Sequence, residues 1–352
     1  MKAHRGTVQE LSASASGRRD SYIDNLKAVL IVLVVVGHAA GQTLGSFAPS
    51  GFLYTWIYFF HMPAFVLLSG MLTRGIKIAD KEVGSLVRTL LVPYVIFQAI
   101  YMAYYDYRGY PVDWNIDRFL SPMYLLWFLP ALLIWRWMAP ILLRIPFVIP
   151  ISILISLGAG LTGSLDNTLA LNRVFAYLPF FVIGLVIGRG RLPKSRGLGI
   201  KTAAALVLVA AMPFAMVFHE KLGINWLYWN LTYEKLEVST MSGIGIRLGM
   251  IVLALIMTAA VCVLVPTGRN IFTRCGENSM YVYVLHGFIT LTFGLSTIDS
   301  LVREPWQFVV VVVLAIVICL LLASNSVKTI FRFLVSPQYV PVSLKDQDRA
   351  VN

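Results

Sequence analysis

The segment LKAVLIVLVVVGHAAGQTLG, residues 26–45, decides the fold class, because Lys27 and His38 are its only ionisable residues. An α-helix of that length rises about 30 Å, which is the thickness of the hydrocarbon core of a bilayer. The segment therefore predicts a membrane-spanning helix, in which the two ionisable side chains need an explanation of their own.

The rest of the chain repeats this composition. Hydrophobic residues make up 58% of the 352 positions and charged residues 13%, whereas soluble domains carry about 25% charged residues. We predict an all-α polytopic membrane protein of about ten transmembrane helices, with an inner (plasma) membrane location. The expected spans are 26–45, 52–72, 86–105, 122–143, 145–162, 174–188, 200–218, 243–265, 279–298 and 307–326.

The charged residues set the predicted topology. The net charge of +12 does not indicate nucleic acid, because Lys and Arg lie between the apolar blocks and not in one patch. They alternate between loops, so both termini are predicted to be cytoplasmic. The fourth and fifth spans abut at Ile145-Pro146; reading them as one broken helix would turn the basic cluster at 189–201 outward, so we keep two. The basic residues used are Arg18, Arg19, Arg74, Lys77, Lys81, Arg144, Arg189, Arg191, Lys194, Arg196, Lys201, Arg269, Arg274, Lys328, Arg332, Lys345 and Arg349.

The domain organisation is simple. Residues 1–20 are polar and lack the apolar core and cleavage site of a secretory signal, so we expect a disordered cytoplasmic tail. Residues 21–334 are predicted to form one transmembrane domain, and 335–352 a C-terminal cytoplasmic tail. The three cysteines have no CxxC spacing, and they predict neither a disulfide nor a zinc site.

Three histidines fall inside predicted spans, namely His38, His61 and His286. His38 lies about 18 Å above the cytoplasmic start of the first span, and His61 about 12 Å below the outer start of the second. Because these depths add up to the core thickness, the two imidazoles are predicted to share one layer. Pro63 lacks an N–H for the carbonyl of Phe59 and predicts a kink beside His61. The alternative, that each histidine only hydrogen-bonds a neighbouring helix, stays open.

Lys27 precedes His38 by 11 positions, which at 100° per residue is within about 20° of three whole turns. Both side chains therefore project from one helix face, about 16 Å apart. This spacing suits an anionic head group at the cytoplasmic mouth whose reactive end reaches the imidazole. Arg88 and Arg74 lie at the same level and could add cations for phosphates. A lysine at a span end can also serve topology alone, and Asp24 is expected to pair with Lys27 or cap the helix.

Five stretches, in order along the chain, resemble signatures of the acyltransferase 3 family of integral membrane acyltransferases, in particular its fucose 4-O-acetylase-like branch. They are Asp24-Asn25-Leu26-Lys27 through Gly37-His38, YFFHMPAFVLLSG at 58–70, RTLLVPYVIF at 88–97, LLWFLPAL at 125–132 and GENSMYVYVLHGF at 276–288. The resemblance covers residues 20–326. One departure is that the family usually has Arg where this chain has Lys27, a point charge without a bidentate fork.

The resemblance implies an enzyme that takes acyl-CoA, with acetyl-CoA expected, from the cytoplasm and acylates a sugar, polysaccharide or glycolipid on the far side. We predict no metal and no nucleic-acid partner. The implied placements are Lys27, Arg88 and Arg74 on the CoA side, His38 and His61 at the reaction layer, Trp127 at the acceptor entrance, and His286 along the CoA channel near the helix start at Asn278 and Ser279.

Acyl transfer from a thioester to a hydroxyl needs a base for the hydroxyl proton and stabilisation of an oxyanion. We predict His38 as the base, with His61 orienting the acceptor or donating to the oxyanion; a transient acyl-histidine stays open. The alternative function is a transporter or flippase for a small molecule or lipid-linked glycan. Such proteins usually carry intramembrane carboxylates and repeats, and neither is evident here. A non-catalytic membrane sensor would not predict three intramembrane histidines.

Overall fold

The computed structural model describes residues 20–73, 84–163, 167–188, 197–294 and 301–337. Every regular element among them is helical, which confirms the all-α class. The predicted tails, apart from residues 20 and 335–337, lie outside the described residues. In chain order the helices are α2 (Ser21–Gly41), α3 (Pro49–Tyr58), α4 (His61–Thr73), η1 (Val87–Leu91), α6 (Val92–Tyr107), α7 (Ile116–Leu120), α8 (Phe128–Leu142), α9 (Val148–Gly158), η2 (Thr168–Ala170), α10 (Leu171–Ala176), α11 (Leu178–Ile187), α12 (Leu198–Leu222), η4 (Ile224–Tyr228), α13 (Thr240–Leu264), α14 (Thr273–Glu277), α15 (Ser279–Gly294), α16 (Pro305–Leu322) and α17 (Asn325–Val335).

Helix length and composition show a multi-pass membrane protein. Six helices are long and apolar enough to cross a bilayer, and a seventh crossing is available from the pair Thr168–Ala176 and Leu178–Ile187, bent by 64°. The other three predicted spans coincide with the shorter apolar helices α8, α9 and α15, of 15, 11 and 16 residues. The count of ten therefore stays a prediction.

The predicted division between the fourth and fifth spans is present as a hairpin. Phe147, with φ 54° in the left-handed region, ends the short connection between α8 and α9. At the start of α8, the ring of Trp127 stacks on Tyr177 with 5.3 Å between centroids. At the end of α9, Ser156 Oγ donates to the carbonyl of Ala176 at 2.6 Å. The start of one helix and the end of the other thus lie at one level, so α8 and α9 run antiparallel.

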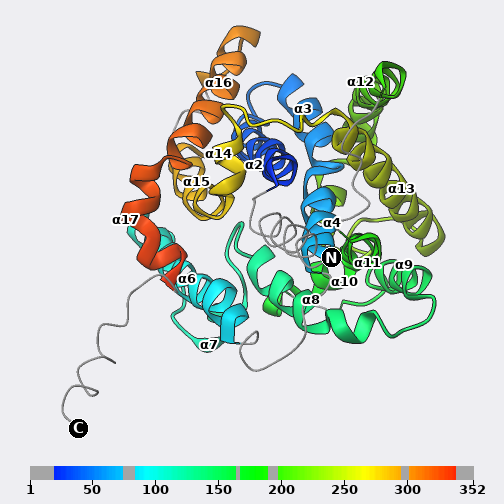
Figure 1. The fold of residues 1–352 in the computed structure, drawn as a ribbon, viewed down its shortest axis with the longest axis horizontal. Helices are drawn as coiled ribbons and strands as arrows, with labels where there is room; N and C mark the ends of the chain where they lie inside the picture. Colours follow the sequence, from blue (N-terminus) through cyan, green and yellow to red (C-terminus); the bar gives the residue numbers. More distant parts are fainter. Residues whose placement is uncertain (1–19, 74–83, 164–166, 189–196, 295–300, 338–352) are drawn as a thin grey trace, which may run out of the picture.

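Helix α2 occupies the middle of the bundle, where α3, α14, α15 and α16 surround it (Figure 1). Asp20 caps its first turn by accepting the N–H of Tyr22 at 3.1 Å. The side chain of Asn25 donates to the carbonyls of Pro266 and Gly268, at 2.8 and 2.7 Å. These bonds fix the start of α2 against the segment that follows α13.

Helices α4 and α11 touch backbone to backbone. A Cβ built on Gly70 would lie 2.1 Å from the carbonyl oxygen of Phe181, and one on Gly184 would lie 1.9 Å from that of Leu67. Neither position can carry a side chain unless the helices separate. This contact holds α4, which begins at His61, in a fixed position.

Helix α2 begins, and α16 ends, at the same face of the bundle. Cys275 Sγ lies 3.8 Å from the carbonyl oxygen of Cys319, near the end of α16, and the next residue, Gly276, meets the backbone of Asp24 near the start of α2. The chain between these points therefore crosses the bundle an even number of times. This agrees with the predicted topology, although which face is cytoplasmic follows from charge alone and stays a prediction.

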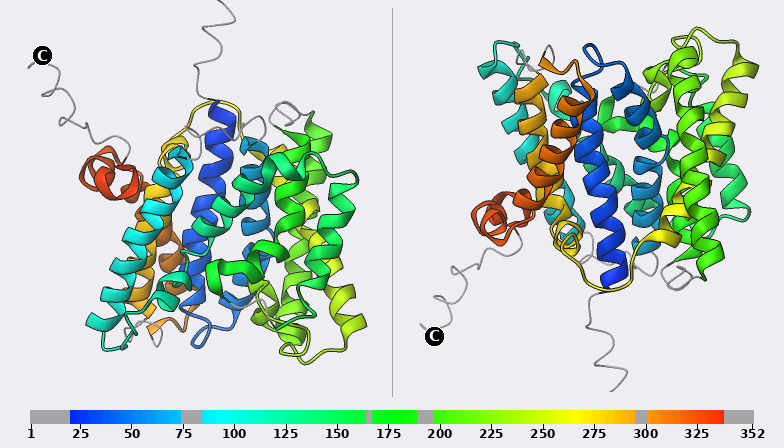
Figure 2. Two further views of the ribbon diagram at one scale, coloured as in Figure 1. Left: turned by 90° about the horizontal axis from the view of Figure 1, so that it is seen from below. Right: turned by 90° about the horizontal axis from the view of Figure 1, so that it is seen from above.

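Helix α17 lies across the direction of the long helices, beside the face where α2 begins (Figure 2). It exposes the apolar side chains of Ile330 and Phe333 together with the basic residues Lys328 and Arg332. This combination is typical of a helix that lies in a membrane interface.

Candidate active site

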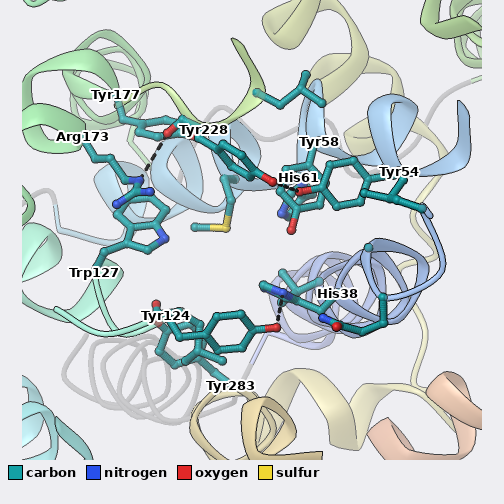
Figure 3. Close-up of a pocket in the computed structure, with 17 residues that line it drawn as sticks. His38, Tyr54, Tyr58, His61, Tyr124, Trp127, Arg173, Tyr177, Tyr228 and Tyr283 are labelled. Atoms are coloured by element: carbon teal, nitrogen blue, oxygen red, sulfur yellow. Dashed lines mark hydrogen bonds between the residues drawn. The ribbon is translucent and has the colours of Figure 1, made fainter. Parts of the chain in front are cut away.

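A cavity of about 350 Å³ opens beside the C-terminal half of α2. His38, His61 and Trp127, which the sequence placed on three separate spans, all line it (Figure 3). We call it the histidine cavity. Its wall also contains six tyrosines, Tyr54, Tyr58, Tyr124, Tyr177, Tyr228 and Tyr283, together with Arg173 and Met62 among others.

His38 faces this cavity from α2 and contacts the loop that precedes α8. Its Nδ1 lies 2.9 Å from the hydroxyl of Tyr124, and that hydroxyl lies 3.3 Å from Oγ1 of Thr290. Thr290 in turn donates to a backbone carbonyl of α15. Tyr124 has φ 50°, an uncommon conformation for a tyrosine that accompanies functional sites in many proteins. The sequence analysis did not identify Tyr124, although it directly precedes the LLWFLPAL stretch.

His61 opens α4, at the helix break predicted from Pro63. The regular helix is interrupted at Phe59 and Phe60 between α3 and α4. Nδ1 of His61 lies 2.9 Å from the carbonyl oxygen of Ile57. Because a carbonyl only accepts, Nδ1 carries the proton, and Nε2 of the neutral ring presents a lone pair.

His286 lies deeper in the bundle than the sequence analysis expected. Its ring centroid is 5.3 Å from that of His38, so it lies beside His38 and not near the helix start. The reason is the position of Gly276, whose Cβ would meet the backbone of Asp24 and Ala28. His286 lies ten residues beyond Gly276, and His38 ten residues beyond Ala28, on helices that run the same way. Nδ1 of His286 donates to the carbonyl of Val282 at 2.9 Å, and its buried Nε2 has no hydrogen-bond partner among the described residues.

A second cavity of about 280 Å³ lies beside the N-terminal half of α2. Lys27 and Ser279 line it, and we call it the lysine cavity. Lys27 Nζ forms an ion pair with Oδ1 of Asp24 at 2.6 Å, which is one of the two roles predicted for Asp24; the cap is Asp20. Arg136, which the sequence analysis did not single out, adds a second cation to the lining.

The other predicted cations do not join this cavity. Arg88 is exposed on η1 and is not part of the lining, which η1 reaches through Leu90. Arg74 lies outside the described residues. The structure thus places Lys27 and Ser279 together, with Arg136 where Arg88 was expected.

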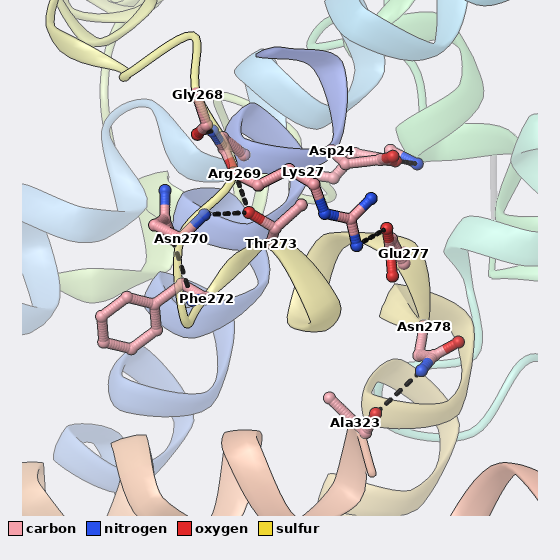
Figure 4. Close-up of polar contacts among 11 residues, drawn as sticks. Asp24, Lys27, Gly268, Arg269, Asn270, Phe272, Thr273, Glu277, Asn278 and Ala323 are labelled. Carbon is pink, nitrogen blue, oxygen red and sulfur yellow. Dashed lines mark hydrogen bonds and ion pairs between the residues drawn. The ribbon is translucent and has the colours of Figure 1, made fainter. Parts of the chain in front are cut away.

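The segment between α13 and α15 borders the same end of α2 (Figure 4). Arg269 forms an ion pair with Glu277 at 2.7 Å, and Thr273 Oγ1 donates to Oδ1 of Asn25 at 2.6 Å. Asn278 Nδ2 donates to the carbonyl of Ala323 at 2.8 Å. These bonds hold the start of α15, and with it Ser279, beside Lys27.

The two cavities share one wall. Val34, Met62 and Tyr283 line both of them. Along α2, Lys27 and Val34 face the lysine cavity, and Val34 and His38 face the histidine cavity. The stripe predicted from the spacing of Lys27 and His38 therefore runs through both cavities, about 16 Å from end to end.

Comparison with known proteins supports the family resemblance. A family model described as "Acyltransferase domain", of the acyltransferase 3 type, matches residues 20–324. The nodulation protein NolL of Sinorhizobium fredii (strain NBRC 101917 / NGR234) is 33% identical over 100 residues. That alignment spans 26% of this chain and 27% of NolL, so it covers only about a quarter of the relative. No solved structure matches. Since the family match covers nearly all described helices, including those that carry both cavities, this chain belongs to the acyltransferase 3 family of membrane acyltransferases.

Proposed function

We propose that this acyltransferase moves an acyl group from cytoplasmic acyl-CoA to a hydroxyl of an extracytoplasmic sugar, polysaccharide or glycolipid, at the inner (plasma) membrane. Acetyl is the group we propose, on the resemblance to O-acetylating members of the family. The observation that carries the proposal is the pair of cavities with a shared wall, a cation at one end and imidazoles at the other.

The donor binds in the lysine cavity. Lys27 and Arg136 attract the phosphates of CoA, and the thioester arm extends along the face of α2 toward Val34. Ser279 can donate a hydrogen bond to an amide carbonyl of that arm. Arg88, exposed nearby, can contribute only to the field that attracts the donor.

The acceptor binds in the histidine cavity. Aromatic rings pack against the apolar faces of sugar rings, and their hydroxyls hydrogen-bond sugar hydroxyls. Trp127, stacked on Tyr177, and Tyr54, stacked on Tyr58 with 3.9 Å between centroids, supply such surfaces on two sides.

His38 acts as the general base. The hydroxyl contacts fit a protonation state in which His38 Nδ1–H donates to Tyr124, Tyr124 donates to Thr290, and Thr290 donates to a backbone carbonyl. Nε2 then carries the lone pair. It takes the acceptor's proton as the hydroxyl oxygen attacks the thioester carbon; the C–S bond then breaks and the thiolate leaves, to be protonated.

His61 orients the acceptor. Its Nδ1–H is committed to Ile57, so Nε2 of the neutral ring can accept a hydrogen bond from a sugar hydroxyl but cannot donate to an oxyanion. Of the two roles considered for His61, the geometry favours the first.

The test uses the enzyme in lipid nanodiscs with radiolabelled acetyl-CoA, and glycans and glycolipids extracted from a strain that lacks the gene. We expect label to enter the extract and free thiol to appear. His38→Ala and His38→Gln should both lower transfer by about 10² to 10⁴, because Gln keeps a hydrogen bond but takes no proton.

If His38→Gln retains more than about a tenth of transfer, His38 is not the base. A larger loss in His61→Gln than in His38→Gln would assign the base to His61. Unlabelled extract and no thiol release by the wild-type enzyme would contradict acyl transfer from CoA altogether.

A further inference from the structure

The histidine cavity contains a cation that the proposed chemistry does not use. Arg173, on α10, lines the cavity, and no Asp or Glu is part of the lining. Among the described residues no carboxylate pairs with Arg173. Removing a guanidinium from water is unfavourable unless a partner compensates it, so an arginine that faces a cavity without a carboxylate partner indicates an anion-binding site.

The protein contacts of Arg173 leave part of its hydrogen-bonding capacity unused. Nε donates to the carbonyl of Tyr228 at 3.2 Å, and Nη1 approaches Oδ1 of Asn167 at 3.4 Å. The guanidinium lies 5.3 Å from the centre of the Trp127 ring. A guanidinium has five N–H donors in a planar fork, which matches the two oxygens of a carboxylate or phosphate.

Arg173 lies across the cavity from the reacting group. In Figure 3, Arg173 and Trp127 are on one side of the cavity and His38 is on the other. Arg173 is therefore placed to bind a part of the acceptor distant from the hydroxyl that is acylated. The same view places Trp127 beside Arg173, so one sugar ring could stack on the indole while its anionic substituent meets the guanidinium.

We infer that Arg173 binds an oxyanion of the acceptor, either a sugar carboxylate or a phosphate, so that the enzyme selects acidic glycans over neutral ones. This rests on the proposed function and adds the substrate class. Arg247 gives a useful contrast, since it is also buried but donates to the carbonyls of Ser156 and Leu231, at 3.2 and 3.1 Å, and does not line the cavity.

The experiment compares matched acceptors in the nanodisc assay with labelled acetyl-CoA. Methyl glucuronide is compared with methyl glucoside, which differs only in the carboxylate, and glucose 1-phosphate provides the phosphate. We expect the wild-type enzyme to favour at least one anionic acceptor by about ten- to a hundredfold in kcat/KM, the range for a hydrogen-bonded charged pair. The favoured probe distinguishes a carboxylate from a phosphate.

Arg173→Gln should remove that preference, because kcat/KM for the anionic acceptor should fall far more than kcat/KM for the neutral one. Arg173→Lys, which keeps the charge without the fork, should retain an intermediate preference. Arg247→Gln is the control and should leave the preference intact.

Two results would overturn the inference while leaving the proposed function standing. One is a wild-type enzyme with no preference for either anionic probe. The other is equal loss of anionic and neutral acceptors in Arg173→Gln, with thiol release intact, which would make Arg173 a tether between α10 and η4. A wild-type enzyme without thiol release would remove the proposed function and this inference together.

Discussion

The contact between His38 and Tyr124 makes the phenol a positioning group. Tyr124→Phe keeps the ring and its packing but removes the acceptor for Nδ1–H. We expect kcat for transfer to fall by about ten- to a hundredfold with little change in the KM for acetyl-CoA, because the base would lose its orientation while the donor site is untouched.

The same substitution in a His38→Gln background should cause almost no further loss, since the two residues act as a unit. Multiplicative losses in the double variant would show that Tyr124 acts independently of His38.

At the level of single residues, helical periodicity predicted the shared face of Lys27 and His38 but did not identify Tyr124 or Arg173. Lys27 and His38 belong to one helix, so their shared face follows from 3.6 residues per turn. Tyr124 and Arg173 reach the histidine cavity through loop and helix-start geometry, including positive φ at Tyr124, Leu169 and Ala170, which no spacing rule encodes. Chemistry alone could have singled out Arg173, a cation directly before the predicted span at 174–188.

Helix α2 is the element that connects the two cavities, and Val34 is the point on it where they meet. Val34→Phe should obstruct the thioester arm and lower transfer by about 10²-fold, a loss typical of misplacing reacting groups by about 1 Å. The KM for acetyl-CoA should rise in parallel. Val32→Phe is the matched control, because this substitution adds the same side-chain volume to α2 at a residue that lines neither cavity. Equal effects of the two substitutions would place the donor path away from Val34.

The positions of helices in the sequence were easier to predict than their positions along the axis of the bundle. The break at Phe59 and Phe60 follows from Pro63, and the division between α8 and α9 lies where the apolar blocks abut. The depth of α15 could not be counted from its own sequence, because it is set by Gly276 against α2, a tertiary contact. Hydrophobic length also overstated α9, which has 11 helical residues where 18 were expected.

For the whole molecule, topology is the property that the sequence predicts and the fold only constrains. A reporter fused after Asn352 or inserted within 189–201 should be cytoplasmic, and one within 220–240 should be outside, because the basic loops alternate with acidic ones. Accessibility to a membrane-impermeant thiol reagent, with single cysteines in those loops, measures the same property. An external C-terminus would contradict both the ten-span topology and the proposed direction of transfer.

The wall of Val34, Met62 and Tyr283 has a consequence for the leakage of ions across the membrane. In the proposed topology the two cavities open toward opposite faces of a membrane that holds a voltage, and these three side chains separate them. Val34 and Met62 offer no strong hydrogen-bonding group, and the Tyr283 hydroxyl donates to the carbonyl of Leu125. A constriction of this kind resists continuous hydration, and without a water column ions do not pass. Under the proposed function, an acyl group therefore passes this wall without opening a path for ions.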